Sequence, residues 1–92
     1  MGFTVLFEME GVTTAQYDNI WKVLDRVGDK TPKGRRFHVG LPTPSGFLVV
    51  DVWDSMEELD RFAKGSLIPA MLESGVTPGQ PRVLPAHLLV QA

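Results

Sequence analysis

Hydrophobic and polar positions alternate along residues 3–10, where Phe3, Val5, Phe7 and Met9 share one side. An alternation with period two is typical of a β-strand that is buried on one face. A glycine follows directly, so the pattern predicts that the strand ends there.

The next segment follows the period of a helix instead. Thr13 followed three residues later by Gln16 fits a capping box, which opens a helix, and Gly28 fits the residue just past its end. Between them the apolar residues fall at helical spacing: Tyr17, Ile20, Trp21, Leu24 and Val27.

Two strands joined by a turn are predicted in the middle of the chain. Residues 35–41 alternate, with Phe37 on one side and Arg36 and His38 on the other. Residues 42–46 are rich in proline, serine and glycine, which are turn residues. Residues 47–53 read FLVVDVW and are apolar at almost every position, as in a strand covered on both faces. We therefore expect a hairpin.

A second helical region begins after this hairpin. Ser55 and Glu58 form another capping box, and Gly65 interrupts the helix that it opens. Ser66 is placed to cap a further helical piece, which Gly75 closes.

Residues 82–90 predict the last strand, and Pro85 favours an edge or a bulge there. The element order is then β-α-β-β-α-β, which is typical of a ferredoxin-like α+β fold with a four-stranded antiparallel sheet. In that arrangement the first and third strands are central and both helices cover one face. The 92 residues make a single domain, 1–92.

The alternation of side chains in the 47–53 strand predicts what packs against each face of the sheet. Leu48, Val50 and Val52 are all aliphatic and suit a seam between two sheets, so we expect a homodimer. Asp51 and Trp53 point the other way, toward the helices.

Composition and charge exclude several classes of function. The net charge is −2, from 9 basic and 11 acidic residues, so no basic field draws the chain to nucleic acid or to anionic membranes. The chain has no cysteine, which excludes disulfides, thiolate metal sites and cysteine nucleophiles. Its apolar runs fall short of the roughly 20 residues of a membrane span. The N-terminus lacks a secretory pattern, and we expect a cytoplasmic protein.

Three stretches carry a resemblance to a known family. FLVVDVWDSMEELDRF at residues 47–62, FHVG at residues 37–40 and PAHLLV at residues 85–90 resemble the small bacterial proteins of the dimeric α+β barrel superfamily, which includes the antibiotic biosynthesis monooxygenases. The resemblance implies a homodimer whose sheets pack into an α+β barrel. It also implies an apolar pocket for an aromatic or polyketide-like small molecule, oxidised without a cofactor.

Haem degradation, another activity of that superfamily, is not expected. Trp53 matches the place of the tryptophan that contacts haem in those relatives. However, residues 3–10 contain no asparagine, and Met71, Leu72 and Glu73 stand where those relatives carry an iron-ligating histidine. We therefore expect no cofactor.

Three residues are candidates for acid/base catalysis: His38, His87 and Asp51. A histidine titrates near neutral pH and suits the removal of a proton from a phenol or enol. Alternatively, each histidine is hydrogen-bonded to a carbonyl or to solvent. A carboxylate on an apolar strand face requires a partner, and the structural alternative for Asp51 is a contact with Arg35, Arg36 or a backbone N–H.

Aromatic residues are the candidates for the wall of a ligand pocket. Tyr17 and Trp21 lie one helical turn apart, and Trp53 and Phe62 are expected to face them. The alternative for all four is ordinary packing of helix against sheet.

Two functions from different classes remain. The first is a homodimeric cofactor-independent monooxygenase acting on an aromatic or polyketide-like molecule. The second is a non-catalytic ligand-binding or interaction module, which needs no base.

Overall fold

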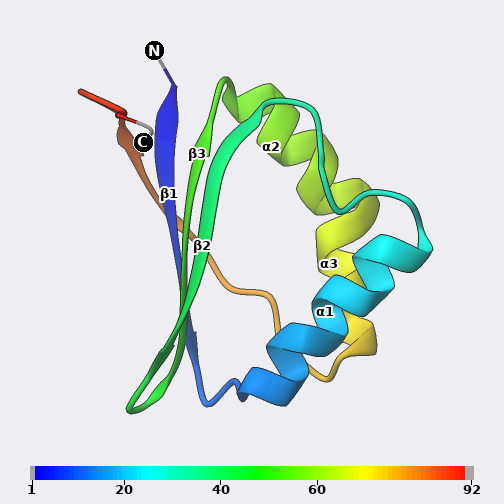
Figure 1. The fold of residues 1–92 in the computed structure, drawn as a ribbon. Coiled ribbons are helices and arrows are strands. Elements are labelled where there is room, and N and C mark those ends of the chain that lie inside the picture. Colours follow the sequence, from blue (N-terminus) through cyan, green and yellow to red (C-terminus); the bar gives the residue numbers. More distant parts are fainter. Residues whose placement is uncertain (1, 91–92) are drawn as a thin grey trace.

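One four-stranded antiparallel sheet carries the fold in the computed structural model, which describes residues 2–90 (Figure 1). Its strands lie in the order β2-β3-β1-β4, so the prediction that the first and third strands are central is confirmed. The strands are β1 (Phe3–Glu10), β2 (Arg35–Thr43), β3 (Gly46–Trp53) and β4 (Arg82–Pro85).

Helices cover one face of this sheet and leave the other uncovered (Figure 1). They are α1 (Thr14–Arg26), α2 (Met56–Phe62) and α3 (Ile68–Glu73), with a turn of π-helix, η1 (Ala63–Leu67), joining α2 to α3. This α+β arrangement is compatible with the ferredoxin-like fold that the element order predicts.

The predicted ends of α1 are confirmed. The Gln16 backbone N–H donates to Thr13 Oγ1 at 3.1 Å, and the Thr13 N–H donates to Gln16 Oε1 at 3.0 Å, which is a complete capping box. Gly28 follows the C-terminus with φ at +76°, a conformation that glycine adopts without a steric penalty.

The predicted break at Gly65 is wrong. The helix continues through Gly65 as the π turn, in which the Ile68 N–H donates to the carbonyl of Ala63. Ser66 does not cap a new helix. Its hydroxyl lies within the π turn and donates to Asp29 Oδ2 at 2.6 Å, linking this turn to the segment after α1.

The predicted last strand is too long. β4 ends at Pro85, and residues 86–90 run on outside the sheet. Proline has no N–H to donate to a ladder, and this strand is an edge strand, as expected.

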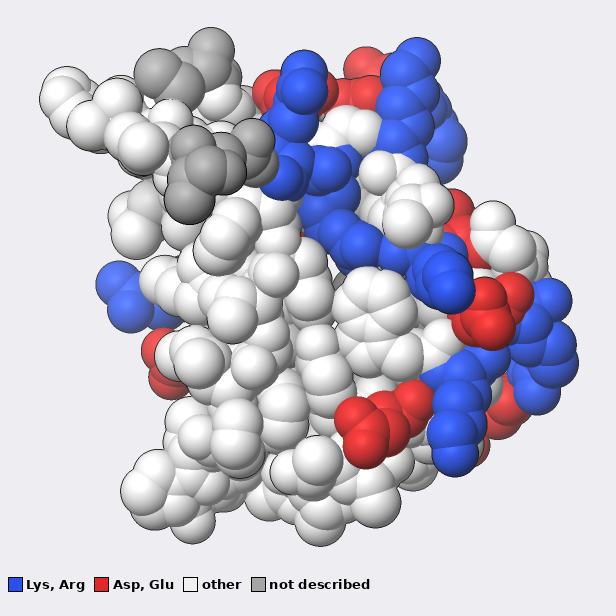
Figure 2. All heavy atoms as spheres, in the orientation of Figure 1, with Lys and Arg blue, Asp and Glu red and all other residues white. Residues whose placement is uncertain are grey.

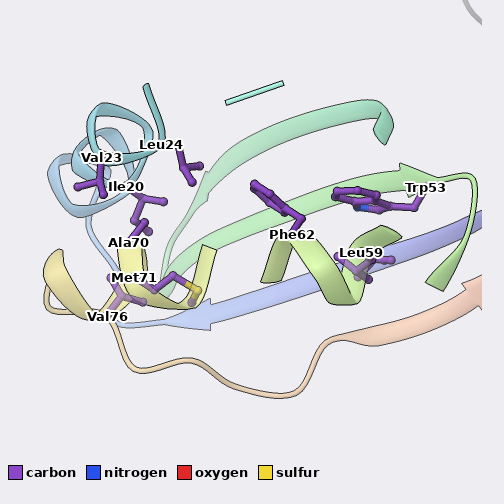
Figure 3. Packing of buried hydrophobic residues seen from close by; sticks show 10 residues of the cluster. Ile20, Val23, Leu24, Trp53, Leu59, Phe62, Ala70, Met71 and Val76 are labelled. Carbon is purple, nitrogen blue, oxygen red and sulfur yellow. The ribbon is translucent and has the colours of Figure 1, made fainter. Parts of the chain in front are cut away.

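The hydrophobic core lies between the sheet and the helices. Side chains point inward from the helices toward the strands in Figure 3. The largest fully buried side chains are Trp53, Leu24 and Val5. On β3 the buried set includes Phe47, Val49, Asp51 and Trp53, so the parity predicted for this strand is confirmed.

The opposite face of the sheet carries apolar side chains without a helix over them. Figure 2 shows the charged residues concentrated on the helical side and a largely uncharged surface on the sheet side. Phe37 and Leu41 on β2 are each 40% exposed, and Leu84 on β4 is 46% exposed.

Candidate functional site

A cavity lies between α1 and the β2–β3 half of the sheet. The volume of the cavity itself is about 40 Å³, and the larger empty space of about 450 Å³ at this place includes open solvent. It is lined by Phe7, Met9, Tyr17, Ile20, Trp21, Leu24, Arg35, His38, Val49, Asp51, Phe62, Leu67 and Met71. A mostly apolar wall with a few polar groups at one place is typical of a small-molecule site.

Those polar groups form a continuous hydrogen-bonded chain. The Tyr17 hydroxyl lies 2.6 Å from His38 Nε2, and His38 Nδ1 lies 2.5 Å from Asp51 Oδ1. The Trp53 indole N–H donates to Asp51 Oδ2 at 3.2 Å. Both carboxylate oxygens therefore have a partner, although Asp51 is only 4% exposed.

The Asp51 carboxylate fixes the direction of the chain. A carboxylate only accepts hydrogen bonds, so Nδ1 of His38 carries the hydrogen. When the imidazole is neutral, its Nε2 accepts a hydrogen bond from the Tyr17 hydroxyl; when it is protonated, Nε2–H donates to the Tyr17 oxygen instead. Tyr17, His38 and Asp51 all line the cavity, and Asp51 is the most deeply buried of the three.

Backbone pairing brings His38 and Asp51 together. They are opposite one another in the antiparallel β2–β3 ladder, where side chains of directly paired residues lie close. The turn between the two strands is only two residues long, Pro44 and Ser45, and it sets this register.

A β-bulge near the start of β2 decides which arginine faces the cavity. Arg35 pairs with Trp53 and Phe37 with Val52, so Arg36 is the extra residue. Regular alternation predicts Arg36 on the side of His38, and that prediction is wrong. Arg35 lines the cavity, while Arg36 binds Asp54 at 2.7 Å.

Gly40 leaves the space that the tyrosine ring occupies. A Cβ atom at this position would lie 2.5 Å from the Tyr17 hydroxyl oxygen. The ring of Tyr17 also stacks on Phe47, with 4.2 Å between centroids and 18° between planes. Gly40 on β2 and the Phe47 ring on β3 therefore hold the Tyr17 phenol against His38.

Burial raises the pKa of the Tyr17 phenol above its ordinary value, and the negative charge of Asp51 adds to this effect. Tyr17 is therefore a neutral hydrogen-bond donor at neutral pH. Burial likewise lowers the pKa of Arg35, but an arginine remains protonated. Its guanidinium carbon lies 5.2 Å from the centroid of the Trp21 ring.

The aromatic candidates occupy two different environments. Tyr17, Trp21 and Phe62 line the cavity, whereas Trp53 is fully buried and is not among its lining residues. The Trp53 ring packs against Phe62 with 5.5 Å between centroids (Figure 3) and holds Asp51 through its N–H. Trp53 thus belongs to the core that supports the site.

The two histidines are also separated. His38 lies in the hydrogen-bonded chain, while His87 is exposed and lies beyond the end of β4. β2 and β4 are opposite edges of the sheet, as predicted. The contacts suggested for Asp51, an arginine or a backbone N–H, are replaced by His38 and Trp53.

The described residues 2–90 include no group of three or more His, Asp or Glu side chains placed to hold a metal ion. Nor does this part of the chain contain a helix with the length and hydropathy needed to cross a membrane.

Comparisons of this chain with protein-family models, with curated proteins and with solved structures give no match. The resemblance to the antibiotic biosynthesis monooxygenases therefore stays a prediction, and the α+β fold rests on the structure.

Titration of the tyrosine tests the electrostatics of the site. Tyr17 is the single tyrosine of the chain, so the ultraviolet absorbance of phenolate reports this residue alone. We expect a midpoint above 10 in the folded protein and a return to about 10 in denaturant. Because the folded-state pKa is the higher one, the free energy of unfolding should fall as the pH rises through the unfolded-state value. A folded-state midpoint at or below 10 would contradict the burial of this phenol.

Proposed function

We propose that this protein binds an aromatic or polyketide-like small molecule in the cavity under α1, and that His38 and Asp51 remove a proton from it through Tyr17. The observation that carries the proposal is the hydrogen-bonded series Tyr17–His38–Asp51 in the wall of a mostly apolar cavity. A base in the wall of a mostly apolar cavity is the machinery that such a deprotonation requires.

The proton moves in one direction along this chain. A ligand hydroxyl, such as that of the enol form of anthrone, donates to the Tyr17 oxygen, and the Tyr17 proton passes to His38 Nε2. The imidazolium that forms lies against the Asp51 carboxylate, whose negative charge stabilises it. Tyr17 is restored as a phenol, and the ligand is left as an anion.

Arg35 is the cation in position to stabilise that anion. It is the one arginine or lysine among the described residues that line the cavity, and its stacking on Trp21 holds it at the wall. A guanidinium in a partly desolvated place acts more strongly on a developing charge than it does in water.

The reaction we propose for the anion is monooxygenation without a cofactor. The deprotonated ligand gives electrons to O₂, and a methylene carbon of the ligand becomes a carbonyl. One oxygen atom enters that carbonyl and the other leaves as water, so a CH₂ group and O₂ yield C=O and H₂O.

The alternative is a non-catalytic ligand-binding or interaction module. The raised pKa of Tyr17 supports it, because a permanently neutral phenol is a good hydrogen-bond donor to a ligand oxygen. In that case Tyr17 binds the ligand and no oxygen is consumed.

Oxygen uptake with anthrone distinguishes these two functions. We expect the protein to consume O₂ faster than a protein-free solution of anthrone does. The His38→Gln variant should lose roughly 100-fold or more of this rate, because a positioned base contributes about that much. His87→Gln is the matched control, since His87 is exposed and outside the site, and its rate should equal that of the wild type.

A result without oxygen uptake still separates the alternatives. Binding of 4-ethylphenol that weakens in Tyr17→Phe, with no uptake above the protein-free rate, would support the binding module and overturn the monooxygenase. Failure to bind 4-ethylphenol or anthrone at all would overturn both.

We also propose that the uncovered sheet face binds a second copy of this chain. Helices already cover the other face, and an exposed apolar sheet surface is typical of an interface. The same patch on two copies is self-complementary under a two-fold axis. Its apolar residues are Leu6, Phe37, Val39, Leu41, Leu48, Val50 and Leu84, and the exposed Glu8–Arg82 pair lies on the same face at β1 and β4.

Light scattering tests the homodimer. The chain mass is 10.2 kDa, and we expect a particle of twice that mass at micromolar concentration. Val50→Glu places a charge in the centre of the patch and should yield monomers, because an unpaired buried charge is costly. Leu72→Glu, an exposed leucine of α3 away from the sheet, is the control and should stay dimeric. A wild-type mass near that of one chain would contradict the dimer.

A further inference from the structure

A second hollow lies beside the proposed site. It is bounded by α2, η1 and α3 on one side and by residues 78–81 and β4 on the other. Its empty volume is about 1060 Å³, including the part open to solvent, and much of its lining is apolar. The charged side chains on its helical side, Asp60 and Lys64, are exposed.

The two hollows share one wall of side chains. Phe7, Met9, Leu67 and Met71 line both. Two of these four are methionines, which are unbranched, flexible and able to move aside at low cost. The partition between the hollows is therefore apolar and adaptable.

The sheet order gives this arrangement a direction. His38 and Asp51 lie on β2 and β3, the shared wall includes Phe7 and Met9 on β1, and Val83 of the second hollow lies on β4. The strand order is β2-β3-β1-β4. The path from the hydrogen-bonded residues His38 and Asp51, through the shared wall and into the second hollow, thus runs across all four strands.

A backbone irregularity lies along the same path. Leu67 ends the π turn and contacts both hollows, while Ala63 and Lys64 of that turn line the second hollow. A π turn inserts one residue into a helix and is frequent at functional sites. Here the π turn is the part of the helical layer that lies between the two hollows.

We infer that the ligand of the proposed site carries an unbranched apolar tail, which crosses the methionine-containing wall and occupies the second hollow. The substrate class is then an alkyl- or acyl-substituted phenol or aromatic polyketide, with its ionisable ring at Tyr17. This inference rests on the proposed function, because the ring must bind under α1 for the tail to point toward β4.

A pair of phenols that differ only in tail length tests it. Each methylene that enters an apolar site raises affinity roughly fourfold, and 4-hexylphenol has four more methylenes than 4-ethylphenol. We expect the hexyl compound to bind at least about 30-fold more tightly to the wild type. Both affinities are measured by titration calorimetry below the solubility limit of the longer compound.

Variants that fill the second hollow locate the tail. Val83→Trp and Ala63→Phe add bulk at positions that line only that hollow, and Val83 is exposed enough to accept a larger side chain. Circular dichroism shows whether each variant is folded. Either folded variant should lose most of the gain in affinity for 4-hexylphenol and keep the wild-type affinity for 4-ethylphenol. Leu72→Phe, at an exposed position that lines neither hollow, is the control and should keep the gain.

The outcomes separate this inference from the proposed function. Binding of 4-ethylphenol without a gain for 4-hexylphenol overturns the tail and leaves the ring site standing. A gain that persists in Val83→Trp shows that the tail binds elsewhere, such as the uncovered sheet face, and also overturns it. If neither phenol binds, the ring site and the tail fail together.

Discussion

Replacing Asp51 with alanine is expected to destabilise the fold by about 2–5 kcal/mol. The substitution removes the acceptor of two hydrogen bonds, from His38 Nδ1 and from the Trp53 indole N–H. Each buried donor left without a partner costs roughly 1–3 kcal/mol. Urea denaturation measures the loss as a lower midpoint with an unchanged slope.

Asp54→Ala is the matched control for this prediction. Asp54 lies just past the end of the same strand, and its ion pair with Arg36 is exposed to solvent. Pairs of that kind contribute about 0–1 kcal/mol. Losses of similar size in the two variants would show that the Asp51 carboxylate is not held as described.

Replacing Trp53 with alanine is expected to cost about 3–5 kcal/mol. The ring is fully buried, and it contacts Phe62 from the helical layer. Its removal leaves a cavity in the core and also takes the indole donor from Asp51. The same urea titration measures the effect.

The Trp21→Ala variant is the comparison that distinguishes a tryptophan of the core from one in the cavity wall. Trp21 has the same side chain, but it lines the open cavity and is only partly buried. We expect it to cost clearly less than Trp53→Ala and to weaken the binding of 4-ethylphenol. If Trp21→Ala proved the more destabilising of the two, the assignment of Trp53 to the core would be wrong.

Much of the fold follows from periodicity and caps. The alternation in residues 3–10 and the Thr13 capping box each depend on short-range physics, so the sequence alone is sufficient to place β1 and the start of α1. The sequence is also sufficient to predict which side chains of β3 face the helices, because Asp51 interrupts an apolar face that includes Trp53.

The site was less accessible to the same reasoning, because it depends on register between strands. His38 and Asp51 are separate candidates in the sequence, since a predicted turn over residues 42–46 leaves the pairing of the two strands undefined. The register follows once the turn is known to be two residues long, Pro44 and Ser45. Counting outward from that turn places His38 opposite Asp51.

Other features have no clear local signal. The π turn keeps the helix going through Gly65, a residue that usually weakens helices, because packing of Leu67 against the core outweighs local propensity. Regular alternation does not show the bulge at Arg36, and it therefore places Arg35 on the side away from the cavity.

That bulge has a further consequence, since the two residues at it are identical. If β2 were regular, Arg36 would face the cavity in place of Arg35, so either register supplies a guanidinium to the site. β2 is an edge strand, and a slip there disturbs pairing with β3 alone. The bulge therefore decides which of two adjacent arginines supplies the positive charge of the cavity, and in this structure it is Arg35.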